Sequence, residues 1–458
     1  RDLHSFPTRR SSDLPSPSPT GVAGTLPEDY YPALKDIIES ALKQSPTMLG
    51  QNVALAQSLA GRYFSSAALW PSLSASGSYG FSAGETTSEP RSSSRGAGLG
   101  YGIGLSQALY QWGANKAQSD IGKLTQQITQ RQFAEAFHGL ANTLRSQYLS
   151  LILKKVGLQN SRYQLQLLEA TLADGEEQLK EGTLAEGDLI VSRLTTQDAR
   201  LALDRMEQDY AVAKRVFQRL AGLTADLDDA SIPTELAHPV YSASTAAVLL
   251  SGFLGGGVEE TPQAQTYALT LKQNDLTLKI VKTNLYYPKF SFGANYSLAT
   301  NTTFNPDPVT SSGISYGFSV SASVPLFNGF AQKGSKISAY AIKRNTELMR
   351  RNYLDSTGDT AQNLRSQLDL SARALELAEV RRALAEDAVK RITEQFNEGS
   401  VAKIVLNGTI GNLNTANMYA FQARADYLNR WTDFVSLVGV DPILHELPAG
   451  YLTLPHGK

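Results

Sequence analysis

The chain of 458 residues repeats itself once, and matching residues are separated by 217 positions. Pro71, in the segment LWPSLSASGSYG, matches Pro288 in YYPKFSFGANYS. The dipeptide Glu181-Gly182 matches Glu398-Gly399 at the same separation. A duplicated chain contains two copies of one supersecondary unit, so an interpretation of the first half must also hold for the second.

Each half contains two segments in which apolar and small polar residues alternate. We expect strands over about 71–84 and 96–109, and again over about 288–300 and 312–327. Ten or more residues with a period of two are typical of a transmembrane β-strand. An antiparallel sandwich with one wet face shows the same alternation, so the strands alone leave both interpretations open.

Six aromatic residues fall at the same end of these expected strands: Trp70, Tyr110, Trp112, Tyr286, Tyr287 and Phe327. Aromatic side chains gather at the membrane–water interfaces of transmembrane barrels. Their position favours the membrane interpretation and predicts an interfacial aromatic belt. The longest apolar run, around Val248–Leu254, is too short for a membrane-spanning helix.

Two stretches of more than a hundred residues contain no proline and carry heptad repeats. Apolar residues recur at one heptad position: Phe137, Leu144, Leu151, Leu158, Leu165, Leu172 and Leu179, then Leu354, Leu368, Leu375, Val389 and Phe396. In the first half we expect a helix over 115–181, a glycine turn, and a returning helix over 186–221. An opening helix over roughly 33–69 should stack end to end on the returning helix.

Composition argues against several classes of function. The formal net charge is −1, so the chain lacks the basic field that a nucleic-acid-binding protein needs. Cysteine is absent, which excludes disulfides and thiolate sites, and the five histidines are scattered without metal-ligand spacing. We therefore expect no enzyme activity, no metal site and no cofactor.

Several short motifs occur in the same order in both halves. They are the helix starts Ser45-Pro46 and Thr261-Pro262, the strand openings LWP and YYP, the strand closings LYQWG and LFNGF, and the glycine turns QLKEGTLAEGDLI and QFNEGSVAKIVLN. Taken together and twice over, these motifs resemble the TolC-type outer-membrane efflux and secretion channel family, the outer membrane factors. The resemblance covers residues 26–445.

The resemblance implies a mainly helical fold with a β-barrel part. Long antiparallel coiled-coil hairpins would form an α-barrel, and a homotrimer would build one 12-stranded β-barrel from four strands per protomer. Open strand edges are not tolerated in lipid, so the strand count also calls for association.

The implied function is a passive exit duct in the outer membrane of a Gram-negative bacterium, with a periplasmic extension. Such a duct serves a tripartite efflux or type I secretion system and carries small molecules or polypeptides. The implied partners are a periplasmic adaptor, an inner-membrane pump and outer-membrane lipid. A coiled-coil surface or adhesin-like protein without a pore remains the alternative.

The resemblance also places the two glycine turns at the periplasmic tip, where the adaptor would bind. The expected contact residues are Gly182, Thr183, Leu184, Gly399, Ser400 and Val401. A gate is expected at Asp188, Lys403 and Asn407, although Val405 stands where the first half has its aspartate. We hypothesise that Asp188 and Lys403 latch neighbouring hairpins in the closed state; the alternative is that both are solvated helix-face charges.

The repeat also predicts the domain boundaries. Residues 1–25 are expected to be a non-native scar and linker, because His4–Leu14 resembles a translated sequencing adapter. The first repeat is expected over 26–222, an equatorial linker over 223–240, the second repeat over 241–445 and a tail over 446–458.

Overall fold

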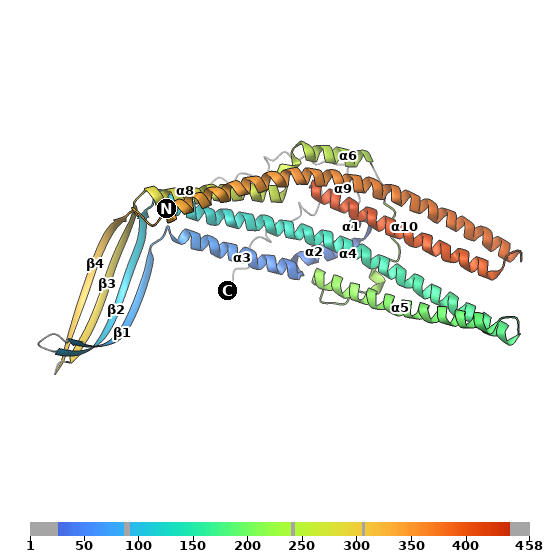
Figure 1. Ribbon diagram of the computed structural model, residues 1–458, viewed down its shortest axis with the longest axis horizontal. Helices are drawn as coiled ribbons and strands as arrows, with labels where there is room; N and C mark the ends of the chain where they lie inside the picture. Colours follow the sequence, from blue (N-terminus) through green and yellow to red (C-terminus); the bar gives the residue numbers. More distant parts are fainter. Residues whose placement is uncertain (1–25, 87–91, 240–242, 305–306, 440–458) are drawn as a thin grey trace, which may run out of the picture.

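The structure is a computed structural model that describes residues 26–86, 92–239, 243–304 and 307–439. The expected scar and the expected C-terminal tail lie outside the described residues. The described part has two regions, a four-stranded sheet at one end and a long bundle of helices that extends away from it (Figure 1).

The sheet contains four antiparallel strands in the order β1-β2-β3-β4. Their bounds are β1 Ser72–Thr86, β2 Ser92–Tyr110, β3 Lys289–Phe304 and β4 Pro308–Ser323. The hairpins β1–β2 and β3–β4 have equivalent registers, since Ser72 lies opposite Ser106, and Lys289, 217 positions on, lies opposite Ser323. Within the described protomer, β1 and β4 each have one free edge.

The strands of the second half are placed differently from the sequence prediction. The strand expected over 312–327 runs from Pro308 to Ser323, because Ser- and Thr-rich residues that resembled a loop are paired. Thr302 lies opposite Thr310, for example, and their hydroxyl oxygens are 3.0 Å apart. Pro325 follows the strand and cannot donate a ladder hydrogen bond.

The helices follow the repeat. In the first half they are α1 Pro27–Tyr30, α2 Pro32–Gln44, α3 Pro46–Ala67, α4 Ala114–Lys180 and α5 Glu186–Ala221. In the second half they are α6 Ala243–Gly252, a π-helical turn over Phe253–Gly257, α7 Val258–Glu260, α8 Pro262–Tyr286, α9 Ala331–Asn397 and α10 Lys403–Val438. We call α4 with α5 hairpin 1 and α9 with α10 hairpin 2; the long helices have 67 residues each and the returning helices 36 each.

The opening helix expected over roughly 33–69 is two helices, and that prediction was wrong in this respect. Proline disfavours a helical conformation at the residue before it, and Ser45, which precedes Pro46, is extended with φ −60° and ψ 134°. The expected end-to-end stacking is present. The Ser45 hydroxyl donates to the carbonyl oxygen of Leu220 at 2.8 Å, so α3 starts where α5 ends, beside α4 (Figure 1).

The apolar core lies at the middle of the helical bundle, where α2, α4, α5 and α10 meet. Leu144, Tyr148, Phe217 and Phe434 are fully buried there. The heptad residues of α4 are buried from Phe137 to Leu158 and become half-buried toward the turn. Among the described residues, none of the helices combines the length and apolarity needed to cross a bilayer.

The observed architecture confirms the predicted fold class, a mainly helical chain with long antiparallel hairpins and a small antiparallel sheet.

Candidate functional site: the sheet, the junction and the helical tips

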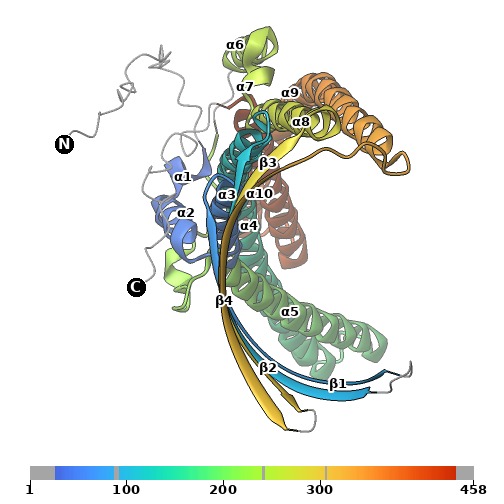
Figure 2. The same ribbon diagram turned by 90° about the vertical axis from the view of Figure 1, so that its left-hand side faces the viewer.

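Neither face of the sheet is covered by a helix (Figures 1 and 2). On one face, large apolar side chains are open to solvent; Tyr79, Phe81, Tyr316 and Phe318 are between 65% and 83% exposed. The opposite face carries small polar residues, and three serine pairs place their hydroxyl oxygens 2.7 Å apart across the strands: Ser72 with Ser106, Ser291 with Ser321, and Ser297 with Ser315. An exposed apolar face of this kind marks a surface for contact with a membrane or another protein.

The six aromatic residues predicted as a belt all lie at the junction of the sheet and the helices, and all are exposed. Three of them form a cluster, in which the ring centroid of Trp112 is 5.1 Å from that of Tyr110, edge to face, and 4.8 Å from that of Tyr287. The Trp112 indole also donates a hydrogen bond to the carbonyl oxygen of Pro288 at 3.0 Å. This contact joins the first repeat to the second where β2 and β3 meet the helices.

Each repeat passes from strand to long helix through two successive left-handed residues. They are Trp112 and Gly113, with φ 50° and 82°, and their equivalents Gly329 and Phe330, with φ 63° and 68°. A non-glycine residue is rare in this conformation, and the aromatic residue has changed places with glycine between the repeats. The backbone turn is thus preserved although its side chains differ.

The two hairpin tips have nearly identical backbones. Gly182 has φ +76° and Gly399 has φ +75°, which an L side chain would strain. The amide of Thr183 donates to the carbonyl of Gln178 at 2.9 Å, and Ser400 donates to Gln395 at the same distance. The predicted adaptor-contact residues lie in these turns, where the glycines, Thr183 and Ser400 are exposed and Leu184 and Val401 are half-buried.

The predicted gate residues lie just beyond the tips, at the starts of α5 and α10. Lys403 donates to a carboxylate oxygen of Asp174 at 2.7 Å, and thereby ties hairpin 2 to α4 of hairpin 1. Asp188 is exposed, and the structure records no salt bridge for it with any described residue; Asn407 is half-buried. Sequence reasoning missed Asp174, because it lies in the other repeat and no local pattern marks it.

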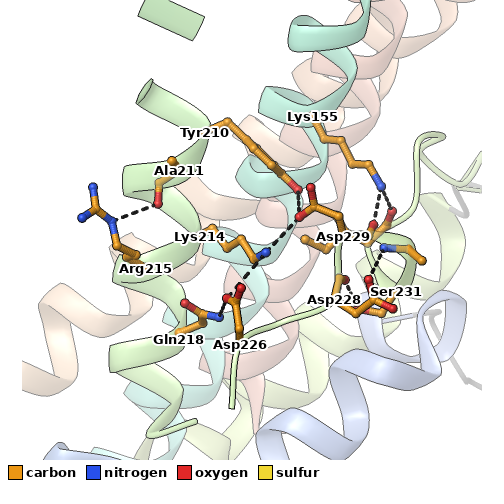
Figure 3. Close-up of polar contacts among 12 residues, drawn as sticks. Lys155, Tyr210, Ala211, Lys214, Arg215, Gln218, Asp226, Asp228, Asp229 and Ser231 are labelled. Carbon is orange, nitrogen blue, oxygen red and sulfur yellow. Dashed lines mark hydrogen bonds and ion pairs between the residues drawn. The ribbon is translucent and has the colours of Figure 1, made fainter. Parts of the chain in front are cut away.

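Between the hairpins' middle sections runs the segment 223–239, which we call the equatorial strap. Its first part is held by hairpin 1 (Figure 3). Lys155 donates to the carbonyls of Asp229 and Ile232, while the Asp229 carboxylate accepts from Lys214 at 3.0 Å and from Tyr210 at 3.1 Å. The hydrogen bond from Lys214 holds the pKa of Asp229 below its ordinary value.

The second part of the strap is held by hairpin 2. The Arg424 guanidinium donates to the carbonyl of Leu236 at 2.8 Å and to Glu379 at 2.6 Å, and His238 lies 3.5 Å from the same carboxylate. The sequence indicated only a linker here. The strap therefore links the two repeats covalently and also holds the two hairpins together through hydrogen bonds.

Within the described residues, no group of histidine and carboxylate side chains could hold a metal ion. The polar contacts at the strap join one element to another, as Lys155 does to Ile232 and Arg424 does to Leu236. The arrangement is typical of a structural bundle, with the sheet exposed at one end and the hairpin tips exposed at the other.

Residues 37–223 match a family described as outer membrane efflux protein. The Campylobacter jejuni CmeC outer membrane channel is similar with a TM-score of 0.66 and 14% identity, over 89% of this chain and 85% of that one. The Vibrio cholerae outer membrane protein VceC gives 0.63 and 14%, over 89% and 96%. The open state of the Neisseria gonorrhoeae MtrE outer membrane channel gives 0.64 and 14%, over 89% of both chains. No curated protein matches the sequence.

Proposed function

Because residues 37–223 match the outer membrane efflux protein family, we propose that the chain is one protomer of a homotrimeric exit duct that connects a periplasmic adaptor to the cell exterior. Its place is the outer membrane of a Gram-negative bacterium, with the helical bundle extending into the periplasm. The duct conducts passively, and an inner-membrane pump selects and drives the cargo.

The observation that carries the proposal is the isolated, amphipathic four-stranded sheet. Its two faces are uncovered and both of its edges are unpaired in the protomer. Backbone groups at a strand edge cost several kcal/mol each in hydrocarbon when they lack a partner, so four strands cannot enter lipid alone. Three copies supply twelve strands, which can close on themselves and leave no edge.

The hairpin tips support the second part of the proposal, contact with an adaptor. The two tips present the same exposed Gly-Thr and Gly-Ser turns, so three protomers offer six nearly equivalent binding sites. The bundle places these turns at the end farthest from the sheet (Figure 1). An adaptor that reaches across the periplasm would meet this end.

Planar-bilayer recording tests the channel directly. We expect detergent-purified protein to run as a heat-modifiable trimer and to produce discrete conductance steps in a lipid bilayer. A protein that never conducts ions, although it is a folded trimer, would instead support a coiled-coil surface protein and overturn the duct.

Paired substitutions at the tips test the adaptor contact separately. Thr183→Glu combined with Ser400→Glu should abolish complementation of an efflux-deficient strain and leave single-channel conductance unchanged. The matched control is Thr195→Glu, an exposed position on α5 away from the turn. If the tip variant complemented as well as the control, the proposed adaptor site would be wrong.

A further inference from the structure

The helices carry an excess of positive charge where they adjoin the sheet. Three stretches meet there: 112–127 at the start of α4, 272–289 at the end of α8, and 331–347 at the start of α9. Together they contain nine lysines and one arginine against three acidic residues. The whole chain has 42 basic and 43 acidic residues, so the excess is a local feature of this end of the bundle.

The three acidic side chains in these stretches already have cationic partners. They form the salt bridges Asp120–Lys123, Asp275–Lys343 and Glu347–Arg344, with distances between 2.6 and 3.0 Å. The remaining seven cations are all lysines, and the structure records no salt bridge between them and any described residue. Lysines that gather without carboxylate partners create a positive potential that attracts anions.

Two of these seven lysines are held at the contact between α8 and α9. The Nζ atom of Lys282 lies 5.4 Å from the ring centroid of Tyr340. In the opposite direction, the Nζ atom of Lys336 lies 5.7 Å from the ring centroid of Tyr286 and donates to its hydroxyl at 3.3 Å. The hydrogen bond from Lys282, with the charges of Lys282, Lys336 and Lys343, lowers the pKa of Tyr340 below its ordinary value.

The two lysines lie close to the aromatic belt. Lys282 is one helical turn before Tyr286, or about 6 Å along the axis of α8. A third lysine, Lys279, lies against the turn after β2, since its Nζ atom is 3.3 Å from the position of a Cβ added at Gly113. The head-group region on each side of a bilayer is about 5–8 Å thick. With the belt at the membrane interface, the ammonium groups therefore lie at the depth of the head groups.

We propose that Lys279, Lys282 and Lys336 form a binding site for the anionic phosphate head group of a phospholipid in the periplasmic leaflet of the membrane. Ammonium groups form strong, charge-assisted hydrogen bonds with phosphate oxygens. Tyr286 and Ile337, which are 61% and 60% exposed, provide apolar surface beside the site for the acyl chains. The inference rests on the proposed place of the sheet in the outer membrane.

The first repeat indicates that each protomer has one such site. The positions equivalent to Lys282 and Lys336, 217 residues earlier, are Ser65 and Ser119. Neither serine carries a charge, and Ser119 is buried. A trimer would therefore bind three head groups, each at the α8–α9 contact.

Binding of short-chain lipids to the detergent-purified protein, measured by microscale thermophoresis, tests the site. Wild type should bind phosphatidylglycerol more tightly than phosphatidylcholine. Lys282→Gln with Lys336→Gln should weaken phosphatidylglycerol binding about 30-fold, because each lysine near an anionic lipid surface contributes about fivefold. Lys282→Arg with Lys336→Arg should retain the preference, since arginine also binds phosphate.

The matched control is Lys180→Gln with Lys390→Gln, which removes two exposed lysines from the long helices far from the sheet. It should bind both lipids as wild type does. Equal affinity of wild type for the two lipids, or equal losses in the two glutamine variants, would overturn the site. Displacement of the lipid by an equal concentration of inorganic phosphate would show a site for soluble phosphate and refute the lipid.

Bilayer recording of the same preparations separates this inference from the proposed duct. Protein that conducts ions but does not prefer phosphatidylglycerol would refute the lysine site and leave the duct standing. Protein that never conducts would refute the duct, whichever lipid it binds.

Discussion

Hairpins 1 and 2 share their lengths and turn geometry and differ in how their helices are held together. In hairpin 1, exposed salt bridges follow one another along the helices toward the tip: Arg162–Glu207, Arg200–Glu169 and Arg193–Glu176. In hairpin 2, the returning helix α10 has no charged residue from Ile404 to Ala423, so it can form no salt bridge over those twenty positions.

The same backbone is therefore stabilised in two ways. In hairpin 2, the salt bridge Arg424–Glu379 joins the two helices at the equator; these positions are equivalent to Glu207 and Arg162, with the charges exchanged. Toward the tip it has glycine, asparagine and threonine, which are weaker helix formers than the residues of α5. The two repeats thus have the same hairpin geometry but different stabilising contacts. We therefore expect the helices near the tip of hairpin 2 to open more often than those of hairpin 1.

The largest expected effect is at the equatorial pair. Arg424→Ala removes one of the two arginine donors to the half-buried Glu379 carboxylate and the arginine donor to the Leu236 carbonyl, and should lower the free energy of unfolding by about 2 kcal/mol. Arg162→Ala removes the exposed equivalent pair and should cost about 1 kcal/mol or less. Thermal denaturation followed by circular dichroism measures both, and equal losses would contradict the comparison.

The equatorial pair should also respond to pH. Burial raises the pKa of Glu379, but the hydrogen bonds and charges of Arg424 and Arg382 together outweigh burial and hold the pKa below its ordinary value. Stability from this pair is then present above the unfolded-state pKa of about 4.3, and is lost as pH falls through the lower folded-state pKa. The difference between wild type and Arg424→Ala should shrink on acidification below about pH 4, and a constant difference would mean that charge is not involved.

The second effect concerns the glycines of α10. A Cβ added at Gly408 would meet nothing within 4 Å, and one at Gly411 would meet only Gln164 Nε2 at 4.0 Å. Gly408→Ala and Gly411→Ala should each stabilise the helix by about 0.5–1 kcal/mol. In hydrogen exchange, amides over 404–417 should exchange faster than those over 187–200 in the wild type, and the double variant should narrow this gap. Equal exchange of the two wild-type segments would contradict a looser second tip.

Much of this architecture could be predicted because its signals are local. Heptads and the glycine turn placed the helices of hairpin 1 at 115–181 and 186–221, and they run from Ala114 to Lys180 and from Glu186 to Ala221. The break at Ser45 was missed, although Pro46 marks it, because the apolar pattern continues across the proline. Strand ends were displaced where Ser- and Thr-rich residues form pairs instead of a loop.

Contacts between the repeats could not be predicted in this way. The Lys403–Asp174 pair and the contacts of the equatorial strap join residues far apart in the sequence, and each consists of ordinary surface residue types. Periodicity identifies the face on which such a residue lies but does not identify its partner. The repeat helps to identify a residue's partner only where the equivalent pair of residues is observed in the structure, as it is for the strands at the sheet edges.

The third effect is to add the missing salt bridge to hairpin 2. Glu386 is equivalent to Glu169, but Asn417 stands where α5 has Arg200, so Asn417→Arg would recreate the Arg200–Glu169 pair in a single substitution. We expect hairpin 2 to gain at most about 1 kcal/mol, because exposed pairs are weak. Arg200→Ala should lose a similar amount from hairpin 1. Hydrogen exchange of the two tips provides the measurement, and slower exchange of α10 with Asn417→Ala than with Asn417→Arg would refute the role of charge.

The smallest expected effect is at the contact between the hairpins. The Lys403–Asp174 pair is about half exposed and worth about 0–1 kcal/mol in each protomer, yet in a trimer three copies would bias the same opening transition. Lys403→Glu should raise the resting conductance of bilayer-reconstituted protein, and adding Asp174→Lys should restore it by re-forming the pair with exchanged charges. Asp188→Lys combined with Lys403→Glu tests the hypothesised latch, whereas Asp174→Lys combined with Lys403→Glu tests the observed contact. Rescue by Asp188→Lys and not by Asp174→Lys would show that Lys403 pairs across protomers when the duct is closed, whereas the contact within the protomer predicts the opposite result.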